Sequence, residues 1–165
     1  MSRSFEDFAA DEVTSMLRYA MVLTCDAQLA QDVVQESLLR AQQRWRRIGE
    51  LDAPAAYVKR MVTNEYLSWR RRRAAKDVAM SHAALDAVGT TAVDAVGRYD
   101  ERDAMLRRIA ILPRKQRAAV VLRYYDGFDD AEIAEVLGCA AVTVRSHISR
   151  ALTTLRAADQ LQEAR

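Results

Sequence analysis

Residues 129–155 read DDAEIAEVLGCAAVTVRSHISRALTTL, and this stretch decides the fold of the chain. Asp129, followed three residues later by Glu132, forms a capping box, which predicts the start of a helix. Gly138 supplies the left-handed residue that ends this helix. After a short turn a second helix is predicted to begin near Ala141. The stretch therefore has the order of a helix-turn-helix.

The second helix of this stretch has two different faces. Its apolar residues recur at helical spacing and predict a face buried in a core: Val144, Ile148, Ala151, Leu152 and Leu155. The opposite face is small or basic: Val142, Arg145, Ser146, Ser149 and Arg150. Residues 140–158 contain no Asp or Glu, as expected of a helix that lies against DNA phosphates. This pattern is typical of a DNA-reading helix, although an ordinary helical hairpin with a solvated polar face has the same periodicity.

The composition predicts an all-α protein. Half of the 165 residues are hydrophobic, and the chain has only five glycines and two prolines, with almost no alternating β pattern. Charge is distributed unevenly: the net charge is −4 over residues 1–43, +7 over 44–76, −4 over 77–105 and +3 over 106–165. This alternation predicts two basic surfaces, separated by an acidic connector and beside an acidic N-terminal face.

Cysteine and histidine usage predicts no cofactor. Cys25 and Cys139 are far apart in the sequence and have apolar neighbours, which indicates two buried, reduced thiols in a cytosolic chain. His82 and His147 have no cysteine or carboxylate partner at ligand spacing, so neither a metal nor another cofactor is expected. A signal-peptide pattern and an apolar run of about 20 residues are both absent, so no membrane insertion is expected.

Residues 1–73 are predicted to form a first small helical domain. Its second helix, capped by Asp26, has a polar ridge that alone indicates only a solvated face: Asp32, Gln35, Glu36, Arg40 and Gln43. A short break over residues 45–52 precedes a third helix, which has Pro54 in its first turn. Glu65 falls near the apolar side of this helix, and we expect it at the margin of a helix pair.

The third helix ends in four adjacent arginines, at 70–73. Such a cluster can serve as a solubilising helix end that interacts favourably with the helix dipole. Because it follows Tyr66 and Trp69, it also suits the phosphates and unstacked bases of single-stranded DNA.

The remaining chain is predicted to be a linker and a second domain. Residues 74–103 are rich in Ala, Val and Asp and predict a flexible linker. Helical periodicity resumes at 101–111, and Pro113 opens another helix before the helix-turn-helix. Residues 104–165 therefore form a second domain of about four helices. The expected architecture is all-α, with two small helical domains joined by the linker.

With both halves placed, the sequence resembles bacterial extracytoplasmic-function sigma factors, and especially their SigE-like subset. Three motifs carry the resemblance: DVVQESLLRA at 32–41, AYVKRMVTNEYLSWRRRR at 56–73, and LPRKQRAAVVLRYYDGFDDAEIAEVLGC at 112–139, which TVRSHISRALTTLR follows from Thr143. The resemblance implies a sigma domain 2 over residues 1–73 and a sigma domain 4 over residues 104–165. It implies core RNA polymerase and promoter DNA as partners, with an anti-sigma factor as a candidate third partner.

The resemblance also implies roles for individual residues. It assigns binding of the polymerase clamp to Asp32, Gln35 and Glu36. It assigns the promoter −10 element to Trp45, Arg60, Asn64, Arg70, Arg71, Arg72 and Arg73. It assigns the −35 element to Val142, Thr143, Arg145, Ser146, Ser149 and Arg150.

The entry to the recognition helix departs from the family pattern, Ser-x-Gly-Thr-Val. Here it is Ala140-Ala141-Val142-Thr143-Val144. Ala140 removes a capping hydrogen bond worth about 1 kcal/mol. Val142 replaces a glycine that lets the helix start approach a phosphate, and its apolar side chain suits contact with a thymine methyl group.

The sequence thus predicts a dissociable polymerase subunit that recognises promoters, helps to open DNA and has no catalysis of its own. It would act in the cytoplasm, associated with the nucleoid. Two alternatives come from other classes. One is a free-standing helix-turn-helix regulator, which would need no polymerase-binding motif in its first half. The other is a nucleic-acid enzyme, for which the sequence offers no carboxylate pair, nucleophile with its base, or phosphate-binding loop.

Overall fold

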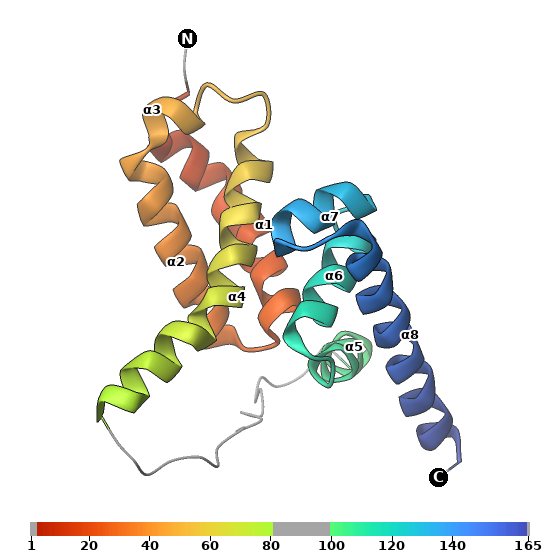
Figure 1. Ribbon diagram of the computed structural model, residues 1–165. Helices are drawn as coiled ribbons and strands as arrows, with labels where there is room; N and C mark the ends of the chain where they lie inside the picture. Colours follow the sequence, from red (N-terminus) through yellow and green to blue (C-terminus); the bar gives the residue numbers. More distant parts are fainter. Residues whose placement is uncertain (1–2, 81–99, 165) are drawn as a thin grey trace.

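The computed structural model describes residues 3–80 and 100–164, and over these ranges all regular structure is helical (Figure 1). The all-α prediction is confirmed. The helices in chain order are α1 (Phe5–Thr24), α2 (Ala27–Gln43), α3 (Trp45–Ile48), α4 (Pro54–Met80), α5 (Asp100–Ala110), α6 (Arg114–Tyr124), α7 (Asp130–Leu137) and α8 (Ala141–Glu163). None of the described helices is both long enough and apolar enough to cross a bilayer.

The first half of the structure, residues 3–80, is a bundle of α1, α2 and α4. Side chains cap the first two helices, since the Ser4 hydroxyl accepts from the Asp7 amide and the Asp26 carboxylate accepts from the Leu29 amide. The two-residue turn between them consists of Cys25, which has a left-handed φ of 54°, and Asp26. This tight turn makes α1 and α2 antiparallel neighbours.

Two boundaries in this half differ from the sequence prediction. Residues 45–52 were expected to be a break, but the first four form α3, whose Ile48 is buried. The residue after α3 is Gly49. A Cβ atom at this position would lie only 3.0 Å from the Trp45 ring, so a larger residue would crowd the indole. The second difference is α4, which continues past residue 73 to Met80. Residues 74–80 contain three alanines and no glycine or proline, so nothing in them ends the helix. The predicted linker over 74–103 otherwise lies mostly outside the described residues.

The helix-turn-helix forms as its sequence predicts. The Asp129 carboxylate accepts from the Glu132 amide, and the Glu132 carboxylate accepts from the Asp129 amide, which completes the capping box. Gly138 ends α7 with a left-handed φ of 63°. Ala140 precedes α8 with an extended backbone and no side-chain cap. Local hydrogen bonding therefore sets both ends of α7, whereas α8 begins without a side-chain cap.

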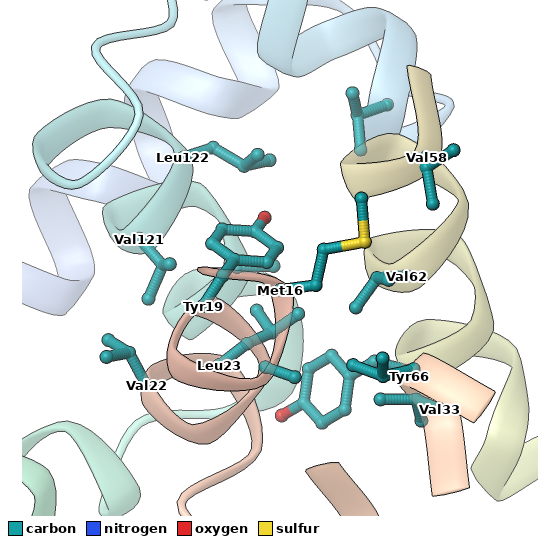
Figure 2. Packing of buried hydrophobic residues seen from close by; sticks show 14 of the residues in the cluster. Met16, Tyr19, Val22, Leu23, Val33, Val58, Val62, Tyr66, Val121 and Leu122 are labelled. Carbon is teal, nitrogen blue, oxygen red and sulfur yellow. The ribbon is translucent and has the colours of Figure 1, made fainter. Parts of the chain in front are cut away.

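The second half, residues 100–164, packs directly against the first half. One cluster of buried residues runs through α1, α2, α4, α6, α7 and α8. Figure 2 shows Tyr19 of α1 between Val62 of α4 and Val121 and Leu122 of α6. The hydroxyl of Tyr19 forms a 2.7 Å hydrogen bond with that of Thr63, so the aromatic side chain is satisfied inside this core. The two predicted helical units are present, and this one apolar cluster joins them.

Candidate nucleic-acid interface

The recognition face of α8 is open to solvent. Its predicted members are exposed apart from the half-buried Thr143: Val142, Arg145, Ser146, Ser149 and Arg150. Val142 is 59% exposed, which is high for an apolar side chain. On the opposite side Val144 and Ala151 are fully buried, and Ile148 packs against the core. The structure thus gives α8 the two faces that its periodicity predicts.

An acidic residue that sequence reasoning missed lies beside this face. Asp130, in the first turn of α7, accepts a hydrogen bond from Arg145 through Oδ2 at 3.2 Å and pairs with Arg123 of α6 through Oδ1. Although α8 carries no acid near its start, tertiary packing supplies one. The fifteen-residue separation from Arg145 explains why helical periodicity could not reveal it.

The Asp130 carboxylate is held in its charged form. Partial burial acts to raise its pKa, but hydrogen bonds from Arg145 and Arg123 outweigh burial and hold the pKa of Asp130 below its usual range. The Arg145 side chain stays 62% exposed, so the pair leaves much of it open to solvent. Asp130 therefore restrains the orientation of Arg145 without covering it.

The second predicted DNA surface, on α4, is only partly open. Asn64, Arg71 and Arg72 are exposed, whereas the side chains of Arg70 and Arg73 lie outside the described residues. Arg60 is 33% exposed, with its guanidinium 3.6 Å from the Glu135 carboxylate and 5.7 Å from the Phe128 ring centre. Both partners of Arg60 belong to the second half of the chain. Arg60 is thus a predicted −10 residue on α4 whose guanidinium is contacted by residues of the second half.

Two other residues of the first half have roles that sequence did not indicate. Glu65, expected at a helix margin, is only 6% exposed and pairs with Arg40 of α2 at 3.0 Å and with Arg72 of α4. Trp45 packs its ring against Phe5 and Phe8, and its indole N–H donates to the Arg3 carbonyl. Trp45 thus has a packing role at the N-terminus of α1, and its assignment to the −10 element stays a prediction.

The acidic ridge on α2 borders an apolar groove. Asp32 and Gln35 are exposed, and Glu36 is half-buried and paired with Arg40 at 2.8 Å. The groove has a volume of about 350 Å³ between α1 and α2 and is lined mainly by Phe5, Val13, Leu17, Val34, Leu38 and Leu39. Leu39, one helical turn after Gln35, is 48% exposed. Charge and apolar surface therefore lie side by side, as in a protein-docking face.

The described residues offer no assembled metal site, since no three His, Cys, Asp or Glu side chains gather at one place there. Cys25 and Cys139 are free thiols, and both are half-buried where the sequence had indicated buried ones. Burial raises the pKa of the Cys25 thiol, against the opposing effect of Arg117. This thiol is therefore held in its protonated, weakly nucleophilic form.

Family models match both halves of the chain. The model described as sigma-70 region 2 matches residues 11–76, and the model described as sigma-70, region 4 matches residues 102–155. The predicted recognition face of α8, residues 142–150, and the acidic ridge on α2 both lie within these matched ranges.

Curated relatives match nearly the whole chain. The RNA polymerase sigma-E factor of Streptomyces coelicolor is 32% identical over 152 residues, which cover 92% of this chain and 84% of the relative. The ECF RNA polymerase sigma factor SigL of Mycobacterium tuberculosis is 36% identical over 148 residues, which cover 88% of this chain and 84% of SigL. Among solved structures, the sigma factor RpoE of Bartonella quintana, in complex with the anti-sigma factor NepR, has a TM-score of 0.69 at 24% identity. The structural match covers 92% of this chain and 94% of the RpoE chain.

Proposed function

The chain belongs to the extracytoplasmic-function sigma factors of bacterial RNA polymerase, and from this premise we propose which of its surfaces bind polymerase and which bind promoter DNA. It is an alternative sigma factor, which binds core RNA polymerase, recognises the −35 and −10 promoter elements and supports promoter opening. It acts as an initiation factor, and we assign it no catalysis of its own.

The observation that carries the assignment of DNA surfaces is the separation of two basic faces onto the two matched regions. The exposed face of α8 reads the −35 element, with Arg145 near the helix start where recognition helices meet base edges. Asn64, Arg71 and Arg72, which are exposed on α4, contact the −10 element together with the neighbouring Arg70 and Arg73. Phosphate contacts from the arginines position the DNA, and Asn64 contributes sequence preference.

The docking face on α2 binds the polymerase. Asp32, Gln35 and Glu36 supply polar and charged contacts, and the adjacent groove accepts apolar side chains of the partner. Because an interface needs an apolar centre with a polar rim, this face is the best candidate for core binding in the described half. An anti-sigma factor is a candidate third partner. We place the protein in the cytoplasm and propose that it associates with the nucleoid through promoter DNA.

The competing function is a free-standing helix-turn-helix regulator. It does not explain why residues 11–76 match the sigma-70 region 2 model, because such a regulator needs no polymerase-binding region. In vitro transcription with purified core enzyme over genomic fragments separates the two. A sigma factor gives defined start sites only when core is present, and specific promoter binding then also requires core. Specific binding of the chain alone, with no start site in the presence of core, would favour the regulator.

The arginine cluster gives a first testable prediction. Replacing Arg70, Arg71 and Arg73 by Gln should lower the slope of log affinity against log salt by about 2 to 3 for promoter binding by the holoenzyme. Arg72 is kept because it pairs with the buried Glu65. Promoters of different sequence should lose similar factors of activity, because phosphates carry no sequence information.

The matched control replaces Arg18, Arg107 and Lys115 by Gln, which removes the same charge at exposed positions outside the proposed DNA surfaces. Binding measured between low and moderate salt should keep the wild-type slope in this control. An unchanged slope in the cluster variant would mean that these side chains only solvate the end of the helix.

The pair of Asp130 and Arg145 gives a second prediction. Asp130→Asn keeps the side-chain size but removes the charge that orients Arg145. Selectivity for the base pair that Arg145 contacts should fall by about threefold to tenfold. Total affinity for DNA should not fall, because the substitution removes a negative charge near phosphates.

Binding to four duplexes that differ only at this base pair measures the effect. In an Arg145→Ala background, Asp130→Asn should leave selectivity unchanged, since the side chain that it orients is gone. Equal loss of selectivity in both backgrounds would show that Asp130 acts only on the stability of α7.

A further inference from the structure

A buried carboxylate between α2 and α4 has no part in the surfaces assigned so far. Glu65 of α4 is only 6% exposed. Burying a charged carboxylate is costly unless opposite charges compensate for the lost water. Two arginines do so, since Arg40 of α2 reaches Oε2 at 3.0 Å and Arg72 of α4 reaches Oε1. Each oxygen of Glu65 is thus contacted by a different arginine.

The contact with Arg72 follows from helical spacing. Residues 65, 68 and 72 lie on one face of α4, because side chains three, four and seven positions apart share a face of a helix. The Arg72 guanidinium also donates to the Ser68 hydroxyl at 3.2 Å. The Arg72 side chain nevertheless stays 47% exposed. Glu65 therefore holds Arg72 from the inner side of α4 and leaves the rest of the side chain open to solvent.

Arg40 joins the same carboxylate to the docking face on α2. Its Nε atom donates to Glu36 Oε1 at 2.8 Å, one turn earlier on α2, and its Nη1 atom lies 3.0 Å from Glu65. The helices α2 and α4 pack against each other in the bundle, which brings these groups together (Figure 1). Charges therefore alternate in sign from the proposed polymerase face to the proposed DNA face, in the order Glu36, Arg40, Glu65 and Arg72.

This row of charges can redistribute without leaving the buried carboxylate uncompensated. Arginine binds a carboxylate most strongly through two parallel N–H bonds, but Arg40 divides its donors between Glu36 and Glu65. If Glu36 is taken by another cation, the donors of Arg40 become available to both oxygens of Glu65. Arg72 can then leave Glu65 at low cost, because Arg40 still neutralises the buried charge.

We propose that Glu65 is a positioning residue of the −10 surface, which releases Arg72 for a DNA phosphate when the polymerase occupies Glu36. This inference rests on the proposed function for the identity of both partners. A cationic group of the polymerase pairs with Glu36, Arg40 turns toward Glu65, and Arg72 becomes free to bind DNA. By linkage, a phosphate on Arg72 favours core binding by the same factor.

The first test reads the Arg72 side chain by NMR on the full chain, without polymerase or DNA. Its signal is identified by its absence in Arg72→Lys. Glu36→Gln removes the acid that competes for Arg40, as the polymerase would. Exchange of the Arg72 guanidinium protons with water should become about threefold faster, as expected for loss of a partly exposed ion pair. In a Glu65→Gln background, Glu36→Gln should leave this exchange unchanged, because the connecting carboxylate is gone.

Arg40→Gln should have an effect of opposite sign. Without Arg40, Glu65 depends on Arg72 for its counter-charge, so exchange of the Arg72 protons should become about threefold slower. A merely structural loss would loosen the helix pair and make the exchange faster. The matched control is Glu50→Gln, which removes one negative charge at an exposed position before α4 and should leave the exchange unchanged. Glu36→Gln and Arg40→Gln both keep the buried acid, so they decide the proposal even if Glu65→Gln does not fold.

The second test measures the linkage with core polymerase. The probe is a single-stranded oligonucleotide that carries the −10 element of a promoter mapped by in vitro transcription. At saturation it should raise the affinity of the chain for core, measured by fluorescence anisotropy. Arg72→Gln and Glu65→Gln should each reduce this gain by about threefold, and the double variant should reduce it no further. Direct contacts between polymerase and the oligonucleotide are the same in all these proteins, so they cancel in the comparison.

Exchange at Arg72 that ignores Glu36→Gln, or that becomes faster in Arg40→Gln, would overturn the proposal. So would an oligonucleotide gain that is equal in the wild type and the variants, or losses that add in the double variant. The proposed function fails separately: a chain that behaves as expected by NMR but gives no start sites with core would have the linked charges without being a sigma factor. Transcription by a chain whose Arg72 exchange ignores both substitutions would remove only the role of Glu65.

Discussion

Reversing the charges of Asp32 and Glu36 to Lys is expected to weaken binding to core polymerase by at least about a hundredfold, or about 2.7 kcal/mol. Asp32 is exposed on α2 and makes only a local contact, accepting a hydrogen bond from Gln28 at 3.0 Å. In the proposed docking, reversal therefore changes a charge at the polymerase interface without disturbing the core. The neighbouring groove stays intact, so the loss measures the charged part of the docking face.

The two substitutions differ in their side effects. Glu36 pairs with Arg40 at 2.8 Å, so Glu36→Lys also places like charges one turn apart, at a cost of about 0.2–0.5 kcal/mol to the helix. Asp32→Lys alone is the better single variant. The control reverses Glu50 and Asp52, two exposed acids in the loop before α4. Affinity for core can be measured by fluorescence anisotropy without DNA. Wild-type affinity in the double reversal, with helicity preserved, would rule out this docking face.

Arg145→Ala is expected to reduce the affinity for the preferred −35 element by about 1–3 kcal/mol and to relax selectivity at one position, if the side chain reads a guanine. Arg145 is exposed near the start of α8, and Asp130 restrains it from one side only. Its remaining donors suit the two acceptors of a guanine edge, which arginine binds with both terminal nitrogens.

Asn64→Ala is the corresponding substitution on the α4 surface proposed to contact the −10 element. Asn64 is exposed on α4, so its loss should alter −10 preference and leave −35 preference unchanged. Active promoters can be selected from a library randomised at both elements with the wild type and each variant. Selection of the same promoters by all three proteins would refute the assignment, as would a shift confined to the −10 element in Arg145→Ala.

Much of this fold could be predicted because its determinants are local. The capping box of Asp129 and Glu132 and the left-handed Gly138 fix α7 through hydrogen bonds that span three or four residues. The spacing of Val144 and Ala151 likewise fixes the buried face of α8, because side chains seven residues apart lie on the same side of a helix. These signals are complete within a short window of sequence.

Helix ends without such signals were predicted less well. α4 was expected to stop near residue 73, yet it continues to Met80, because no capping residue or glycine marks an end there. α3 was missed because four residues are too few to show periodicity. Its helical form depends on the packing of Trp45 against Phe5 and Phe8, which are about forty residues away.

The sequence by itself determined the helical class, the helix-turn-helix and the two faces of α8, because backbone hydrogen bonds and helical periodicity act between near neighbours. Only the tertiary structure decided how the charged side chains pair. Asp130 meets Arg145, Glu65 lies buried between Arg40 and Arg72, and Lys59 meets Asp126 across 67 residues. An ion pair depends on where packed helices bring two charges together, and that placement follows from the apolar core that the helices share.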